Sequence, residues 1–193
     1  MLLLAVPCAP APKMMVQQAS LPGWWKAMAA LPGLECRFTQ SSESAVFGKL
    51  TRTGRLQKAS GGRLRVAYAS GLLLVSDGAS LVHYDPEART AQRLELTAAV
   101  LDMPLLNLLV DPGALPESYV LEPAGLDALR LRPRRAGLPD VLVEGRGQCA
   151  TRLRWKDGTG AEQELRLQDP RVVPGIAAAT FRFDAPKGTR WLK

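Results

Sequence analysis

Apolar and polar residues alternate along most of this chain, and the polar position is often an arginine. The clearest alternating runs are residues 34–39, 64–66, 129–132, 153–156, 165–168 and 181–184. A period of two places the apolar side chains of a strand on one face and the polar ones on the other, as in an antiparallel sheet with one wet face. Turn signals such as Gly61-Gly62, Asp77-Gly78 and Asp157-Gly158 separate the runs. The pattern predicts a long antiparallel meander with a single apolar face.

Residues 72–86, LLLVSDGASLVHYDP, carry the sharpest local signal. An Asp-Gly pair between two apolar runs is typical of a β-hairpin. We therefore expect a hairpin here, with Asp77 and Asp85 as turn formers. His83 is the single histidine of the chain, and we interpret it as a structural residue of the second strand.

Two segments have helical rather than strand character. Trp24, Met28 and Leu31 fall at i, i+4 and i+7 after a possible N-cap at Ser20, which predicts a short amphipathic helix that ends at Pro32-Gly33. Residues 97–110, TAAVLDMPLLNLLV, are strongly apolar without a period of two. Because proline suits the first turn of a helix, Pro104 divides this stretch into two predicted short helices.

These elements predict a fold of the α+β class that is mainly β. A long twisted sheet tends to curl, so we expect an incomplete, half-open antiparallel β-barrel covered by a lid of about three short α-helices. Residues 20–193 would form a single domain. A wide aliphatic sheet under a thin cover suits an apolar ligand such as an acyl chain.

The N-terminal residues 1–19 are expected to be a signal-peptide remnant and linker, because an apolar run ends in small residues. Cys8 could be a lipoprotein acylation site, but Pro7 before it is unfavourable for that modification. No stretch reaches the roughly 20 apolar residues of a membrane-spanning helix.

Charge and cysteine content exclude several classes of function. The formal charge is +7, but the arginines are spread along the chain and no nucleic-acid motif accompanies them. With no CxxC pair and one histidine, a zinc site is not expected, and no cofactor is predicted. Cys36 and Cys149 lie in predicted strands as either buried thiols or a disulfide. No catalytic motif is present, so we predict a binding protein and not an enzyme.

Several segments, in order, resemble the LolA family of periplasmic lipoprotein carriers. LECRFTQ at 34–40 is similar to the first strand of that family, and Gly54-Arg55-Leu56 with GRLRV at 62–66 is similar to one of its hairpins. The segment at 72–86 is similar to its most recognisable motif, MPLLNLL at 103–109 to a lid helix, and FRFDAPKG at 181–188 to its closing strand and loop.

The resemblance implies a monomeric periplasmic carrier that takes acylated lipoproteins from an inner-membrane ABC transporter and delivers them to an outer-membrane receptor. Two alternatives share the fold: a membrane-anchored lipoprotein receptor, which acylation of Cys8 would favour, and a lipid-sensing regulatory domain.

One departure from the family concerns the end of its second strand, where an Arg-Pro pair helps hold the lid shut. Ser60-Gly61 stands at that place here, and the nearby Arg63 and Arg65 are the candidates to substitute for the missing arginine. Val66 also replaces a family aromatic, which makes the expected cavity more aliphatic.

The carrier interpretation predicts that acyl chains contact a set of apolar residues from the helices and the sheet. These are Trp24, Met28, Leu31, Leu34, Cys36, Phe38, Leu50, Leu56, Leu64, Val66, Leu105, Leu106, Leu108 and Leu109.

Overall fold

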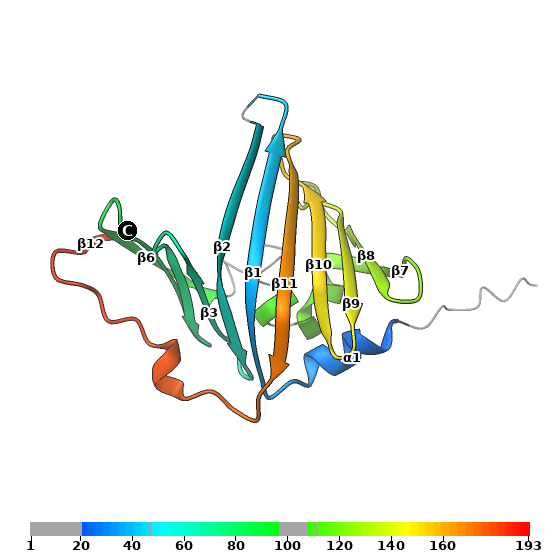
Figure 1. Cartoon of the computed structure of the whole chain (residues 1–193), viewed down its shortest axis with the longest axis horizontal. Coiled ribbons are helices and arrows are strands. Elements are labelled where there is room, and N and C mark those ends of the chain that lie inside the picture. Colours follow the sequence, from blue (N-terminus) through cyan, green and yellow to red (C-terminus); the bar gives the residue numbers. More distant parts are fainter. Residues whose placement is uncertain (1–20, 47, 97–107, 111) are drawn as a thin grey trace, which may run out of the picture.

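The computed structural model describes residues 21–46, 48–96, 108–110 and 112–193, and its main feature is one twelve-stranded sheet (Figure 1). Two antiparallel meanders build this sheet, and they are joined where β1 pairs with β11. The first meander is β1 (Gly33–Ser44), β2 (Gly48–Ala59), β3 (Arg63–Tyr68), β4 (Leu73–Asp77), β5 (Ser80–Asp85) and β6 (Thr90–Glu95). The second is β7 (Tyr119–Pro123), β8 (Ala128–Pro133), β9 (Val141–Arg146), β10 (Cys149–Lys156) and β11 (Glu162–Val172).

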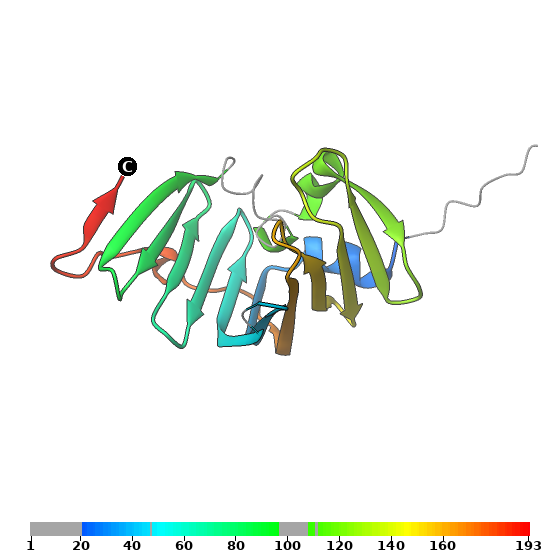
Figure 2. The same cartoon turned by 90° about the horizontal axis from the view of Figure 1, so that it is seen from above.

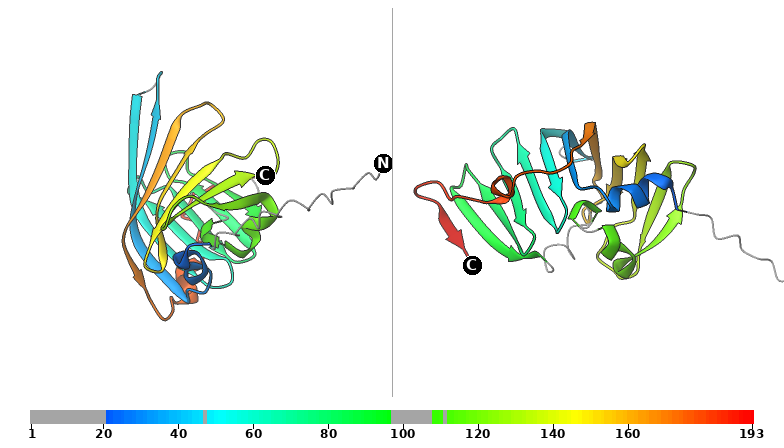
Figure 3. Two further views of the ribbon diagram at one scale, coloured as in Figure 1. Left: turned by 90° about the vertical axis from the view of Figure 1, so that its right-hand side faces the viewer. Right: turned by 90° about the horizontal axis from the view of Figure 1, so that it is seen from below.

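The sheet is open. Its edges are β7 and β12 (Arg190–Leu192), and β12 adds to β6 in parallel while all the other pairs are antiparallel. Figures 2 and 3 show that the sheet bends strongly, so that the two meanders form the walls of a trough. The predicted fold class, a mainly β and incompletely closed antiparallel sheet with a few short helices, is confirmed.

The helical elements are short. They are α1 (Gly23–Ala29), the 3-10 turn η1 (Pro112–Ala114), α4 (Leu115–Ser118) and the 3-10 turn η2 (Ala178–Phe181). Residues 108–110 are also helical. The first predicted helix is thus present with narrower bounds, and Pro22 is its N-cap. Most of the two helices predicted over 97–110 lies outside the described residues, as does the predicted signal remnant and linker.

The predicted hairpin at 72–86 is confirmed as β4 and β5. The Asp77 carboxylate accepts hydrogen bonds from the backbone N–H groups of Ala79 and Ser80, both at 2.9 Å. These bonds lower the pKa of Asp77. Gly78 has φ +103°, and a Cβ there would lie 2.2 Å from the Gly61 carbonyl oxygen, so the turn requires glycine.

The alternation along the strands sorts the side chains into two faces. The inner face, inside the bend, carries Leu34, Cys36 and Phe38 of β1 together with Leu153 of β10. The opposite, outer face of the second meander carries charged residues that pair across strands, such as Arg132 of β8 with Glu122 of β7 at 2.7 Å. The arginines of the alternating pattern therefore mark the wet face.

The strand predicted at 181–184 is wrong. Phe181 instead ends η2, and residues 182–184 form no strand. From β11 this C-terminal segment crosses to the far edge of the sheet (Figure 1). On the outer face of the first meander, Phe183 packs on a small cluster of Leu73, Val75, Val82 and Ala91. The alternation reflects two phenylalanines that pack on the sheet without joining its ladder.

Candidate functional site

The inner face of the sheet holds a large cluster of buried apolar side chains, here called the inner cluster. Both meanders contribute to it, and so do α1, residues 108–110 and α4. Its buried members are Trp24, Trp25, Met28, Leu31, Leu34, Cys36, Phe38, Leu56, Leu64, Val66, Leu81, Leu108, Leu109, Val110, Leu115, Tyr119, Leu129, Leu131, Val141, Val143, Cys149, Ala150, Leu153, Leu165 and Leu167.

Helix α1 is fixed on this surface by three specific contacts to β9, β10 and the β7–β8 turn. The Trp24 ring lies on Gly145, where a Cβ would come within 2.1 Å of it. Trp24 Nε1 donates to the carbonyl oxygen of Asp127 at 3.0 Å, and the Ala150 N–H donates to Met28 Sδ at 3.4 Å. A seven-residue helix is unstable alone, so these contacts hold α1 in place.

The structure brings most of the predicted acyl-contact residues together in the inner cluster. They are Trp24, Met28, Leu31, Leu34, Cys36, Phe38, Leu56, Leu64, Val66, Leu108 and Leu109. Leu50 is the exception, because it lies near the tip of the β1–β2 hairpin, beyond the part of the sheet that the helices cover, and is 52% exposed. Leu105 and Leu106 lie outside the described residues.

The second meander contributes members that the predicted site did not include. Leu129 and Leu131 of β8 face Val143 and Val141 of β9 across the ladder, and Tyr119 begins β7. The signal was available, because Leu129-Arg130-Leu131-Arg132 already indicated a strand with one apolar face. The bend of the sheet places this apolar face opposite the first meander, so that both faces contribute to the inner cluster.

A basic side chain lies on the inner face, and sequence reasoning missed it. Lys58 of β2 is 3% exposed and stands in register between Leu34 of β1 and Leu64 of β3. It shares the inner face with Leu56, two positions earlier in the strand. Position 58 is therefore buried, as the alternation of β2 requires, although the residue there is basic.

Arg63 and Arg65, the candidates to substitute for the family's lid arginine, do not lie on the inner face. Both side chains lie on the outer face, since their positions in β3 alternate with those of Leu64 and Val66. The Arg63 guanidinium stacks over the Phe181 ring at 5.6 Å, and Arg65 Nη1 donates to the Thr180 carbonyl at 3.2 Å. These two arginines therefore contact the C-terminal segment on the outer face and not the inner cluster.

Cys36 and Cys149 are buried free thiols. They belong to β1 and β10, which flank β11. Two strand spacings separate Cα atoms by about 9 Å, beyond the roughly 4.4–6.8 Å of disulfides. Burial, with a smaller contribution from Cys149, raises the pKa of Cys36 to about 12, and burial also raises the pKa of Cys149.

We expect both thiols to be unreactive in the folded protein, because the reactive thiolate is suppressed. In a Cys8→Ser variant, Ellman's reagent should label neither cysteine at pH 8 in the native state and both after denaturation without reductant. Absence of labelling after denaturation would instead show that the two residues form a disulfide.

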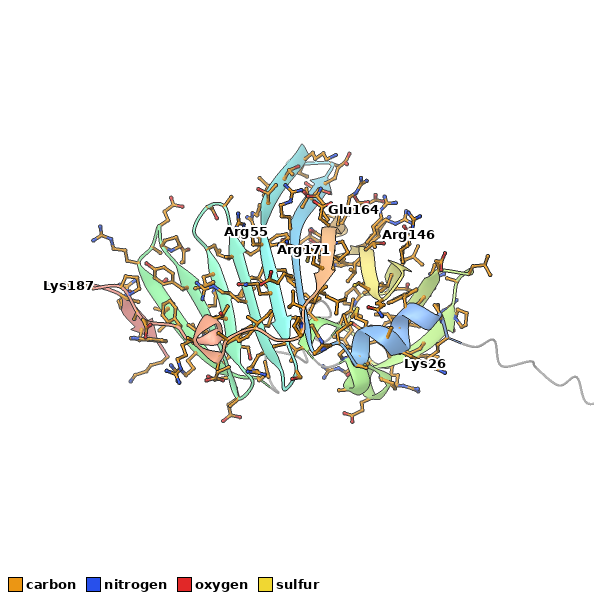
Figure 4. The ribbon with its side chains drawn as sticks, turned by 60° about the horizontal axis from the view of Figure 1, so that its bottom comes forward. Lys26, Arg55, Arg146, Glu164, Arg171 and Lys187 are labelled. Atoms are coloured by element: carbon orange, nitrogen blue, oxygen red, sulfur yellow. The ribbon has the colours of Figure 1, made fainter. Side chains whose placement is uncertain are left out.

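The outer face has a hollow of a different character. A groove of about 430 Å³ runs over β2, β1 and β11, and Figure 4 shows Arg55 and Arg171 close together there. Most of its lining residues are charged: they are Glu35, Arg37, Arg55, Asp169 and Arg171, with Cys36, Leu56 and Gln57. Arg37 pairs with Asp169, and Arg171 Nη2 lies 3.8 Å from Glu35 Oε2. A groove with mainly charged side chains in its lining does not suit an acyl chain.

A charge network continues over the outer face of the second meander, where Figure 4 labels Glu164. Glu164 accepts hydrogen bonds from Arg152 and Arg166. Partial burial raises its pKa, but the bonds from these two guanidinium groups outweigh that effect and lower it. Glu144 pairs with Arg154 at 2.7 Å. The outer face is therefore polar where the inner face is apolar.

Within the part of the chain that the structure describes, no group of three or more His, Cys, Asp or Glu side chains could hold a metal ion. Across the same residues, no helix is both long and apolar enough to cross a membrane.

Comparison with known families decides the classification. Residues 30–184 match the family model described as "Outer membrane lipoprotein carrier protein LolA". The chain belongs to the LolA family. LolA proteins are carriers and not a family of enzymes.

Two curated relatives carry the name outer-membrane lipoprotein carrier protein. The one from Bordetella avium (strain 197N) is 28% identical over 161 residues, which are 80% of this chain and 73% of the relative. The one from Chromohalobacter salexigens is 29% identical over 124 residues, 60% of this chain and 58% of the relative. The chain thus spans somewhat more than half of the second relative.

The fold also resembles a solved structure, described as an uncharacterized conserved protein from Thermus thermophilus. The TM-score is 0.55 at 12% sequence identity, and the match covers 86% of this chain and 92% of the other. This similarity concerns the fold alone.

Proposed function

We propose that this LolA-family protein is a periplasmic carrier that binds the acyl chains of lipoproteins on its inner face and moves them from the inner to the outer membrane. The observation that supports the proposal is the inner cluster, in which two meanders and the short helices gather apolar side chains in a chain of a lipoprotein carrier family. Its partners would be acylated lipoproteins, an inner-membrane lipoprotein-releasing ABC transporter and an outer-membrane receptor.

The cover of the inner cluster is suited to exchange with a ligand. Helix α1 has seven residues and α4 has four, and such short helices depend on their tertiary contacts for stability. An acyl chain that enters the trough would make apolar contacts with the sheet like those that these helices make. Transfer from water contributes about 0.8 kcal/mol per methylene, without directional bonds, which suits a cargo that must later be released.

The direct test is to express the full chain in a bacterial periplasm, purify it and identify co-purified material by mass spectrometry. The proposal expects acylated lipoproteins or lipids in the purified fraction, and displacement of a fluorescent fatty acid from the protein by a synthetic lipopeptide. Recovery of no lipid, together with no binding of the fluorescent fatty acid, would contradict it.

A matched pair of variants locates the acyl site. Met28→Gln keeps nearly the same side-chain volume but places an amide at a completely buried position of the inner cluster, where it would weaken the apolar contacts that an acyl chain shares with α1. The expected loss of lipopeptide affinity is about tenfold. Leu50→Gln makes a similar change on the exposed hairpin and should leave the affinity unchanged. Titration with the fluorescent fatty acid measures both, and equal effects would place the site elsewhere.

A further inference from the structure

Tyr119 is a buried polar group that the inner cluster does not satisfy. It begins β7 directly after α4, and its side chain is completely buried in the inner cluster. Its hydroxyl oxygen is itself inaccessible and has no hydrogen-bond partner among the described residues. Buried tyrosine hydroxyls usually have a partner, and an unmet donor in an apolar surrounding is costly.

Other polar groups on this side of the sheet do have partners. The Tyr68 hydroxyl donates to Gln40 Oε1 at 2.9 Å, and Trp24 Nε1 donates to the carbonyl oxygen of Asp127. Ser76 Oγ donates to the Gly62 carbonyl at 2.9 Å and accepts from the Gly78 N–H at 3.1 Å. Tyr119 differs from these groups, because its hydroxyl has no hydrogen-bond partner among the described residues.

The Tyr119 hydroxyl remains a donor at physiological pH. Burial raises its pKa to about 12, an effect that the nearby charge of Arg135 only partly opposes. A neutral donor inside an apolar wall can bind a neutral acceptor without the desolvation cost of a charge.

We propose that the Tyr119 hydroxyl donates a hydrogen bond to a carbonyl oxygen that links a fatty chain to its ligand. This inference rests on the proposed function and names the chemical class of the ligand. The protein would bind fatty chains joined by an ester or amide in preference to ether-linked chains or bare hydrocarbon. An acyl group carries a carbonyl at its head, and that oxygen loses water when the chain enters the inner cluster. The open donor of Tyr119 would replace the lost water.

The test compares Tyr119→Phe with the wild-type chain. Each is titrated with a lipopeptide that bears ester-linked hexadecanoyl chains and with an analogue in which ether links replace the ester carbonyls. Because a neutral hydrogen bond is worth about one order of magnitude in affinity, the wild type should prefer the ester form about tenfold. Tyr119→Phe should abolish this preference and leave the affinity for the ether form unchanged. A diester phospholipid, as a third ligand, shows whether the carbonyl source is a lipoprotein or a membrane lipid.

Tyr68→Phe is the matched control, because it removes a hydroxyl that already has a partner. It should lower the melting temperature and leave the ester–ether preference intact, whereas Tyr119→Phe should melt no lower than the wild type. An unchanged preference in Tyr119→Phe, as expected if a bound water occupies the hydroxyl, would overturn the inference. Failure of the wild type to bind either lipopeptide would overturn the proposed function itself.

Discussion

Gly145→Ala should lower the free energy of unfolding by about 3 kcal/mol. The added Cβ would lie 2.1 Å from Cδ2 of the Trp24 indole and 2.3 Å from Cε2. This ring cannot move aside cheaply, because its Nε1 is bonded to the Asp127 carbonyl and it packs edge-on against Trp25 at 5.9 Å. Either α1 leaves the sheet or β9 distorts.

Urea unfolding followed by tryptophan fluorescence measures this loss. Gly158→Ala is the control, since a Cβ there would meet nothing within 4 Å, and it should cost less than about 0.5 kcal/mol. In a Trp24→Ala background, Gly145→Ala should cost far less, because the two positions are coupled only through this contact. An equal cost in both backgrounds would show that the glycine is required for another reason.

The strands of this fold could be predicted because their signal is local. Leu34 to Thr39 and Leu153 to Lys156 alternate with a period of two, and a half-buried strand produces that pattern wherever it sits in a sheet. The hairpin at Asp77-Gly78 could be predicted for a similar reason, since its turn depends on a few consecutive residues. The family resemblance then supplied the arrangement of these strands.

Long-range pairing has no such local signal. Nothing in the alternation of β1 indicates that it pairs with β11, more than a hundred residues later, and this pairing converts two meanders into one trough. For the same reason Leu129 and Leu131 indicated a strand but not a site. Leu50 shows the converse: its place in the alternation is correct, but the hairpin extends beyond the cover.

One missed signal concerns the outer face of β4. Residues 72–75 read Leu-Leu-Leu-Val, a run with no alternation, which is typical of a strand buried on both sides. In the structure Leu74 faces the inner cluster, whereas Leu73 and Val75 face the C-terminal segment. The run therefore indicated that a second segment covers the outer face of β4. The alternation at 181–184 predicted a strand there, so this segment was not identified as the cover.

Phe181→Ala is expected to have an effect of similar size, a loss of about 3–4 kcal/mol in the free energy of unfolding. The ring is 2% exposed and lies under the Arg63 guanidinium at 5.6 Å. Its removal leaves a cavity and frees that cation. The neighbouring contact of Phe183 with Tyr84, at 5.3 Å between ring centroids, cannot replace it, because it lies further along the segment.

Phe181→Ala also tests whether the outer and inner faces of the sheet act independently. Limited proteolysis should cut Phe181→Ala between residues 173 and 189 faster than the wild type, while Val172→Ala, at a half-exposed position where the segment begins, should match the wild type. Acyl ligands bound to the inner face should keep their affinity for the folded fraction of Phe181→Ala, since Phe181 lies across the sheet from them. A parallel loss of stability and ligand affinity would mean that the C-terminal segment shapes the trough through the sheet, and that the two faces do not act independently.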